Sequence, residues 1–233
     1  AFLLIVVFIG YPFVLGVWMA LTDKVVGSPG NFVGAANFIK LLGSDIFHTA
    51  AWNTVFFTIT ATAIKAALGM WLAVLLNRKF SFSRATRAVV LLPFIVPTVL
   101  STLVWLWMLD GTFSVFNWIL QWFWKLEIGA FGFILKEDLG FIRGPNWLGD
   151  QGYSMGSIIM VNVWRGLPFF AISFLAALQT VPTELYDAAD IDGASGWKKF
   201  WHVTLPMIKP VAIVVVVFSF VITFADFQLV YVL

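Results

Sequence analysis

The stretch Glu184–Pro206, ELYDAADIDGASGWKKFWHVTLP, is the longest conspicuously polar segment between two apolar runs of this chain. Its charged residues fall on either side of Gly193 and are Glu184, Asp187, Asp190 and Asp192 before it, then Lys198 and Lys199 after it. An apolar and nearly neutral protein gains little from solvating such a loop. We therefore interpret residues 179–209, here called the polar loop, as a folded cytoplasmic segment that binds a partner.

The polar loop carries the signals of two short helices joined by a turn. Thr183 is placed to cap the first helix, and the acids of its first turns lie at the positive end of the helix dipole. Asp192-Gly193 predicts the helix end, because glycine accepts the left-handed backbone that a helix end often needs. We expect Ser195 to start the second helix and Pro206 to end it.

The composition predicts an all-α, polytopic bundle of transmembrane helices. Hydrophobic residues make up 61% of the chain and charged residues 11%, and several apolar runs reach the roughly 20 residues that cross a bilayer. The predicted spans are residues 2–21, 52–76, 88–109, 154–178 and 211 onward. Within the loop 22–51, residues 38–42 form an amphipathic piece. Because both ends fall inside apolar runs, we expect the chain to be a fragment of a longer protein.

Charge in the loops predicts the orientation of these spans. Residues 77–87, here called the basic loop, hold four cations and no acid, which the positive-inside rule places in the cytoplasm. Residues 110–153 are then an extracytoplasmic connection. Within it, residues 115–135 are apolar enough to cross, but Lys125, Glu127 and three tryptophans favour an interfacial helix. If residues 115–135 do not cross the membrane, the basic loop and the polar loop lie on the same side of it.

Three ionisable residues, Lys65, Arg165 and Asp226, fall inside predicted spans. Such residues face a bundle interior and often function, because a charge at mid-bilayer is costly. Polar and aromatic residues recur with them at helical spacing: Phe94, Thr98, Ser101, Thr102 and Trp105; Asn162, Gly166, Phe169 and Ser173; Ser219 and Thr223. These faces can enclose a wet path for a hydroxyl-rich solute. The alternatives are that they hold helices together and that Arg165 and Asp226 form a structural ion pair.

Several function classes find no support in the sequence. There is no cysteine, and His48 and His202 are far apart, so a metal site is not expected. No GxxxxGK[ST] phosphate loop occurs, so we expect no ATP site, no cofactor and no enzymatic activity in this chain. Nothing indicates nucleic-acid binding.

The polar loop resembles a known family motif. Asp187-Ala188-Ala189, three residues, Gly193, nine residues, Val203, one residue and Leu205-Pro206 is similar to the EAA loop of binding-protein-dependent ABC importer permeases. The family usually has glutamate at the position of Asp187 and isoleucine at that of Val203. The resemblance implies a type I importer permease fold with a six-helix core, of which this chain holds five spans. It also implies that the loop docks on a partner ATPase through Glu184, Asp187, Ala188, Ala189, Asp192, Gly193, Leu205 and Pro206.

The resemblance extends to the carbohydrate branch, the maltose- and glycerol-phosphate-type permeases, through segments such as VNVWRGLPFFAISFLAALQTVPTELYDAADIDGA and FADFQLVYVL. It implies a substrate path through Phe94, Thr98, Asn162, Arg165, Gly166, Phe169, Ser219, Thr223 and Asp226. Amides are more usual in the family at the positions of Thr223 and Asp226. The region 112–145 does not share the resemblance, and the family implies one more helix after Leu233.

The leading hypothesis is a pore subunit of an ATP-driven carbohydrate importer in a bacterial plasma (inner) membrane. Its expected partners are a second permease subunit, two ATPase subunits that bind ATP and magnesium, and an extracytoplasmic solute-binding protein. The solute could be neutral or, given Lys65 and Arg165, anionic. The alternative is an ion-coupled carrier or channel in which Lys65, Arg165 and Asp226 form an intramembrane relay.

Overall fold

The computed structural model describes residues 2–25, 27, 30–78, 81–111, 114–120 and 145–233. Within these ranges the regular elements are helices, apart from one isolated β-bridge between Thr22 and Phe32. The chain divides into two compact units, residues 1–55 and 56–233. Among the described residues, four helical segments are long and apolar enough to cross a membrane, and a bent pair of helices gives a fifth if the pair is counted as one span. The predicted polytopic helical fold is confirmed.

The first unit holds the first span and the short helix that follows it. Helix α1 (Phe2–Ile5), the π-helix η1 (Val6–Gly10) and α2 (Tyr11–Ala20) run without interruption. The π-turn of η1 widens the helix just before Pro12. After the connection, α3 (Ala36–Leu42) is the predicted amphipathic piece. Asn37 Nδ2 ties it back by donating to the carbonyls of Ala20 and Thr22, at 2.9 and 2.8 Å.

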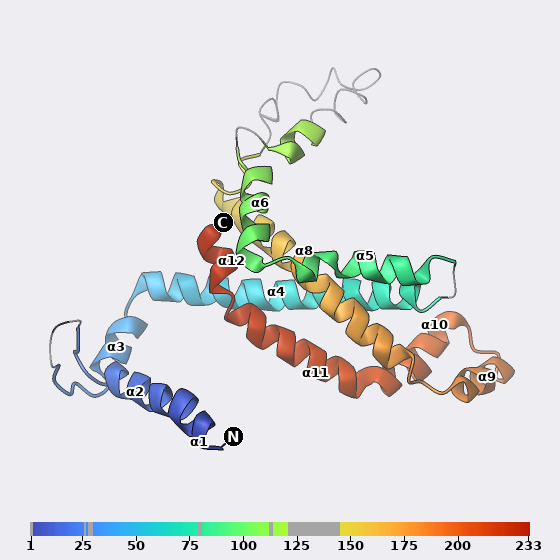
Figure 1. The fold of residues 1–233 in the computed structure, drawn as a ribbon, viewed down its shortest axis with the longest axis horizontal. Coiled ribbons are helices and arrows are strands. Elements are labelled where there is room, and N and C mark those ends of the chain that lie inside the picture. Colours follow the sequence, from blue (N-terminus) through green and yellow to red (C-terminus); the bar gives the residue numbers. More distant parts are fainter. Residues whose placement is uncertain (1, 26, 28–29, 79–80, 112–113, 121–144) are drawn as a thin grey trace. The chain divides into compact units, whose positions relative to one another are not determined.

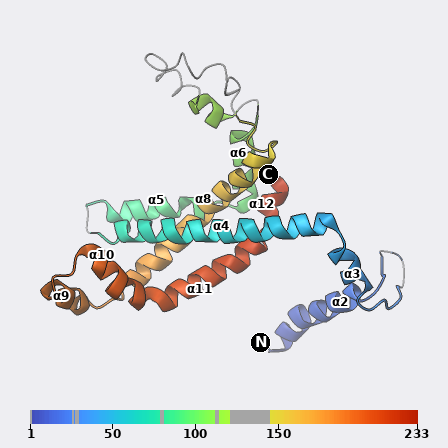
Figure 2. The same cartoon turned by 180° about the vertical axis from the view of Figure 1, so that it is seen from behind.

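The second unit contains the remaining helices, shown in Figures 1 and 2. Helix α4 (Asp45–Leu76) begins in the first unit and starts earlier than the predicted span 52–76. The others are α5 (Ser83–Ile95), α6 (Thr98–Met108), α8 (Gln151–Leu178), α9 (Thr183–Ile191), α10 (Gly196–Lys199), the π-helix η2 (Phe200–Thr204), α11 (Leu205–Phe224) and α12 (Phe227–Val232). Residues 115–120 are helical, and the rest of the predicted interfacial helix lies outside the described residues.

The third predicted span, residues 88–109, is divided between two helices and is not one straight helix. Helices α5 and α6 meet at an angle of 89°. The break falls at Val96 and Pro97, where Val96 adopts an extended backbone with ψ of 130°. A residue before proline is pushed out of the helical region, and the proline has no N–H to continue the helix. Pro93, by contrast, stays inside α5.

The polar loop has the predicted helix, turn and helix, with two corrections. Thr183 does not cap α9, because it is the first helical residue and Pro182 takes the cap position without a side-chain bond. Gly193 does end the first helix, at a φ of +69°, and the Ser195 hydroxyl caps the second helix by accepting from the Lys198 N–H at 3.5 Å.

Pro206 does not end the second helix, and this is the second correction. The helix continues from α10 through η2 into α11, so the fifth span starts at Leu205 rather than at Val211. In the π-turn the Leu205 N–H bonds to the Phe200 carbonyl, five residues back. This wider turn accommodates the ring of Pro206, which sits in the first turn of α11, where a missing N–H is tolerated.

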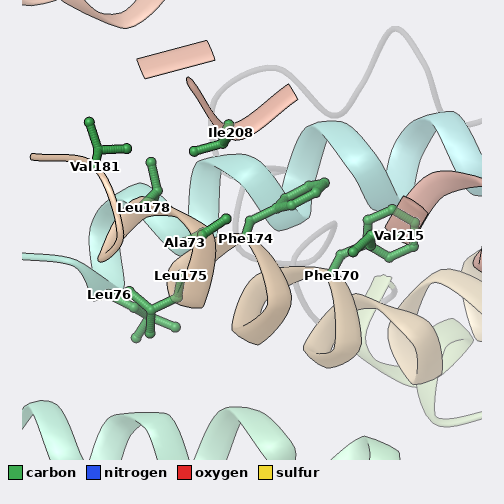
Figure 3. Packing of buried hydrophobic residues seen from close by; sticks show 10 residues of the cluster. Ala73, Leu76, Phe170, Phe174, Leu175, Leu178, Val181, Ile208 and Val215 are labelled. Atoms are coloured by element: carbon green, nitrogen blue, oxygen red, sulfur yellow. The ribbon is translucent and has the colours of Figure 1, made fainter. Parts of the chain in front are cut away.

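The core of the second unit lies where α4, α8 and α11 pack together (Figure 3). Phe170 and Phe174 of α8 are its largest fully buried side chains. Gly69 of α4 allows the close approach, because a Cβ there would lie 2.4 Å from the Phe170 Cβ. Small residues at such crossings let helix backbones approach in membranes, where packing replaces the hydrophobic driving force between helices.

The basic loop and the polar loop lie at the same end of the second unit (Figures 1 and 2). At that end Arg87 Nη2 donates to the Leu76 carbonyl at 3.1 Å, which satisfies one of the free carbonyls at the end of α4. This is the arrangement that the positive-inside argument predicts for two cytoplasmic loops.

A Gly69→Ala substitution tests the close packing of α4 on α8. We expect a loss of roughly 1–3 kcal/mol, because the added methyl overpacks the contact with Phe170. The measurement is thermal unfolding of the purified protein. Gly156→Ala, also in a helix but with nothing within 4 Å of its Cβ, is the matched control and should be neutral. Equal stability of the two variants would contradict the packing role.

Candidate functional site: a polar cavity at the helix break

A cavity of about 230 Å³ lies where the break between α5 and α6 faces α4, α8 and α11. Both helix ends at the break contribute to its wall, Phe94 from α5 and Thr98 from α6. The lining residues are Lys65, Phe94, Val96, Thr98, Asn162, Arg165, Gly166, Phe169, Phe218, Ser219, Ile222 and Thr223. The cavity is therefore built by four separate segments of sequence, one of which is the kinked span.

The structure brings the predicted substrate-path residues together. All of them except Asp226 line this one cavity. The cavity also includes Lys65, Val96, Phe218 and Ile222, which were not predicted to line the path. Val96 lies at the helix break, whereas Phe218 and Ile222 adjoin Ser219 and Thr223 on α11 and could have been found by widening that face.

A chain of polar contacts crosses the helices beside the cavity. Lys65 Nζ on α4 donates to Asn162 Oδ1 on α8 at 2.9 Å and to Thr223 Oγ1 on α11 at 2.7 Å. Asn162 Nδ2 in turn donates to Asp226 Oδ2 at 3.0 Å. Lys65 is only 3% exposed, so its side chain lies within this set of polar contacts and not on the surface of the protein. We call these contacts, with the ion pair described next, the polar network.

Asp226 closes the polar network from a second helix break. Its carboxylate forms an ion pair with Arg165 Nη2 of α8, and its other oxygen accepts from the Leu229 N–H at the start of α12. Ser219 and Thr223 share one face of α11 as predicted, but Asp226 does not lie on that helix, because α11 ends at Phe224. The ion pair between Arg165 and Asp226, one of the two alternatives considered from the sequence, is therefore present.

Gly166 makes room for the lysine in this network. A Cβ at Gly166 would lie 2.6 Å from the Lys65 Cδ. Any larger residue there would displace the aliphatic part of the Lys65 side chain. The role of Gly166 is therefore to let a side chain from α4 cross the surface of α8.

Aromatic rings form the apolar part of the cavity wall. Phe169 stacks on Phe94 with ring centroids 6.2 Å apart and contacts Phe218 at 5.6 Å. Rings of this kind present flat apolar faces, while the amide, hydroxyl and charged groups beside them supply hydrogen bonds. The combination suits a ligand with both apolar faces and hydroxyl groups.

Other predicted polar residues serve packing. Ser101 Oγ and Thr102 Oγ1 both donate to the Thr98 carbonyl, at 2.9 and 2.8 Å, so their hydroxyls are satisfied within α6. Thr58 and Thr62 are buried on α4, and no hydrogen bond of their hydroxyls is found among the described residues. Like Gly69, they lie on the stripe of α4 that carries Lys65.

The polar loop is folded by two contacts between its helices. Tyr186 Oη lies 3.0 Å from Thr204 Oγ1, and Lys199 Nζ lies 2.6 Å from Asp190 Oδ1. The predicted docking residues Glu184, Asp187, Ala188, Asp192, Gly193 and Pro206 are exposed, and Ala189 and Leu205 are partly buried. Ile191 and Trp197 are 88% and 71% exposed. The loop thus presents free carboxylates and bare apolar side chains at one end of the unit.

No cluster of three or more metal-ligating side chains occurs among the described residues.

Residues 65–233 match the family described as "Binding-protein-dependent transport system inner membrane component". The chain belongs to this family. It is therefore a multi-pass inner-membrane permease component, which favours the importer hypothesis over the ion-coupled carrier. A permease subunit of a transporter is not an enzyme in its own right. The match covers the cavity, the polar network and the polar loop.

Relatives with sugar-transport names are similar over most of the chain. The trehalose/maltose transport system permease protein MalF of Thermococcus litoralis is 33% identical over 98% of this chain and 72% of its own. The arabinooligosaccharides permease protein AraP of Bacillus subtilis is 32% identical over 97% of this chain and 67% of its own. The sulfoquinovosyl glycerol permease protein SmoG of Agrobacterium fabrum is 31% identical over 88% of this chain and 61% of its own.

The fold has a solved counterpart in the crystal structure of a bacterial ABC transporter involved in the import of the acidic polysaccharide alginate. The similarity has a TM-score of 0.76 at 23% identity and covers 97% of this chain and 71% of that chain. The predicted importer permease fold is confirmed.

Removing Asp226 should destabilise the protein more than removing the whole ion pair. Asp226→Ala leaves the partly buried Arg165 guanidinium without its counter-charge, which costs less than the roughly 3–5 kcal/mol of a fully buried pair. The double variant Arg165→Met/Asp226→Ala removes both charges and should recover much of this loss. Thermal unfolding of the purified protein measures both, with the exposed Asp187→Ala as control. A double variant less stable than Asp226→Ala would contradict this account.

Proposed function

We propose that this chain is one of two membrane-spanning permease subunits of an ATP-driven importer that moves a carbohydrate across the membrane. The single observation that carries the proposal is the cavity at the α5–α6 break, where aromatic, hydroxyl and amide groups converge inside a membrane-embedded bundle. Family membership supports the transporter class, and the sugar-transport names of the relatives support the substrate class.

The cavity suits a carbohydrate for a chemical reason. The faces of sugar rings carry C–H groups that pack on aromatic rings such as Phe94 and Phe169, while their hydroxyls need donors and acceptors at the edge. Asn162, Ser219 and Thr223 supply such groups from two helices. A purely apolar cavity would leave the hydroxyls unpaired, at a cost in free energy for each one.

The polar loop is the proposed docking site for the ATPase subunits. The chain has no phosphate-binding loop of its own, so ATP and magnesium would bind the partner ATPases. The exposed acids Glu184, Asp187 and Asp192 offer charges to a basic surface, and Ala188, Ala189 and Gly193 allow close approach. Ile191 and Trp197 would be covered in the complex, because large apolar side chains exposed together mark interaction sites.

Two further partners complete the proposed importer. A second permease would complete the translocation path, and an extracytoplasmic solute-binding protein would deliver the sugar. A solved alginate transporter of similar fold, described in complex with a pentasaccharide-bound periplasmic protein, supports the latter. In the proposed cycle, closure of the ATPases on ATP moves the polar loop and switches the helices between two states with different access.

Purification of the assembled complex tests the proposed function. An ATPase should co-purify, and its hydrolysis should rise when the solute-binding protein and its sugar are added. Uptake into proteoliposomes should require ATP inside. Uptake that follows an ion gradient, without a bound ATPase, would overturn the proposal.

Gly193→Asp should uncouple ATP hydrolysis from uptake while leaving the protein folded. Asp is among the few residues that tolerate a positive φ, and a Cβ at Gly193 meets nothing within 4 Å. The backbone strain of this substitution stays within the exposed turn, so the membrane-spanning helices remain folded, and the added carboxylate obstructs the docking surface. Proteoliposome uptake should fall at least tenfold.

Gly152→Asp is the matched control for this variant. It makes the same chemical change at the opposite end of α8, also in open space, and it should retain uptake. Normal uptake in Gly193→Asp would contradict the docking role of the polar loop.

A further inference from the structure

We propose that the cavity selects a carbohydrate that carries an anionic group, a carboxylate or a sulfonate, and that Lys65 is the residue that binds this group. The proposal rests on the proposed function, because it names the substrate class of the same site. It adds that the site prefers a negative charge on the sugar. It also adds a specificity-determining residue, Lys65, which lies on α4 and not on the helices of the predicted substrate path.

The charges around the cavity are unbalanced. Its wall holds two cations, Lys65 and Arg165, and no acidic residue. Asp226, the acid that the described part of the chain places beside the cavity, is not part of the wall, and its carboxylate is paired with Arg165. One carboxylate therefore stands against two cations, and it is in direct contact with Arg165 and not with Lys65.

The contacts of Lys65 point to the same conclusion. An ammonium group has three N–H donors, and two of them go to Asn162 Oδ1 and Thr223 Oγ1. Both acceptors are neutral, and no ion pair of Lys65 exists within the described part of the chain. The third donor is left for a ligand, and because Lys65 lines the cavity, the ligand in the cavity is within its reach.

Burial makes this charge effective. Lys65 is 97% shielded, since its exposed fraction is 3%, and buried charges normally have a counter-charge because burial alone is unfavourable. An anionic solute would supply the missing counter-charge when it enters. A charge-assisted hydrogen bond to the ammonium is about twice as strong as a neutral one. An anionic solute therefore binds more tightly than a neutral one of the same shape.

The rest of the cavity sets the size and kind of group that the site accepts. Its 230 Å³ is smaller than the roughly 300–1,000 Å³ of sites for drug-sized ligands, which favours one sugar ring at a time. Phe94, Phe169 and Phe218 offer the ring a stacking surface. The site therefore fits a single acidic sugar unit, with its ring against the aromatic wall and its acidic group at Lys65.

The experiment compares two matched monosaccharides on the assembled wild-type transporter in nanodiscs, without the solute-binding protein. One is neutral, and the other differs only by a carboxylate in place of one CH₂OH group. Isothermal titration calorimetry should show roughly tenfold tighter binding of the acidic sugar, which is about 1.4 kcal/mol. Equal binding of the two sugars, tighter binding of the neutral one, or binding of neither would overturn the proposal.

Variants of Lys65 then assign the preference to this residue. Lys65→Met should reduce the tenfold preference to about one, and the readout is this ratio of the two affinities, because the loss of the bonds from Lys65 to Asn162 and Thr223 alters the site for both sugars alike. Lys65→Arg keeps the charge and should retain most of the preference. A preference that persists in Lys65→Met would overturn the role of Lys65. If the Lys65→Met variant does not assemble, the comparison of the two sugars on the wild-type transporter still decides the charge preference. The variant Lys65→Gln, which keeps a hydrogen-bond donor, is then used in place of Lys65→Met.

The outcomes separate this proposal from the proposed function. If a neutral sugar stimulates ATP hydrolysis and uptake but the acidic sugar has no advantage, the importer stands and the charge preference falls. If no ATPase co-purifies with the chain, the proposed function itself fails.

Discussion

The polar network that joins Lys65, Asn162, Thr223, Asp226 and Arg165 is the interaction on which the second unit depends. A bilayer offers no water to satisfy polar groups, so each of them must find a partner inside the protein. Lys65 reaches Asn162 and Thr223, and Asp226 reaches Asn162 and Arg165. The network therefore fixes how α4, α8 and the α11–α12 break are positioned, and the glycines at 69 and 166 let these partners come close enough.

Both helix breaks of the second unit border the same site. The α5–α6 break at Pro97 places Phe94 and Thr98 on the cavity wall. The α11–α12 break places Asp226 against Arg165, behind that wall. Irregular backbone inside a membrane is tolerated where it is buried in protein or lines a cavity. The breaks are therefore part of how the site is built.

A continuous helical path connects the polar loop to the cavity. From Gly196 the chain runs through α10, η2 and α11 to Phe224, and the same helix carries Ser219 and Thr223. In the proposed importer, a movement imposed on the loop would be transmitted along this helix to the polar network. The π-turn at η2, next to the contact between Tyr186 and Thr204, is where loop and span join.

The sequence by itself determined the helical membrane fold, because apolar runs of bilayer length have few alternatives. It also determined the turn at Gly193 and most of the residues that line the cavity, because these follow from local backbone preference and helical periodicity. Only the tertiary structure decided which buried charges pair, that Lys65 has neutral partners alone, and that the third span bends by 89°. Pro93 and Pro97 look equivalent in sequence, yet only Pro97 breaks the helix. Pairing and bending depend on contacts between segments far apart in the chain, and no local pattern specifies these.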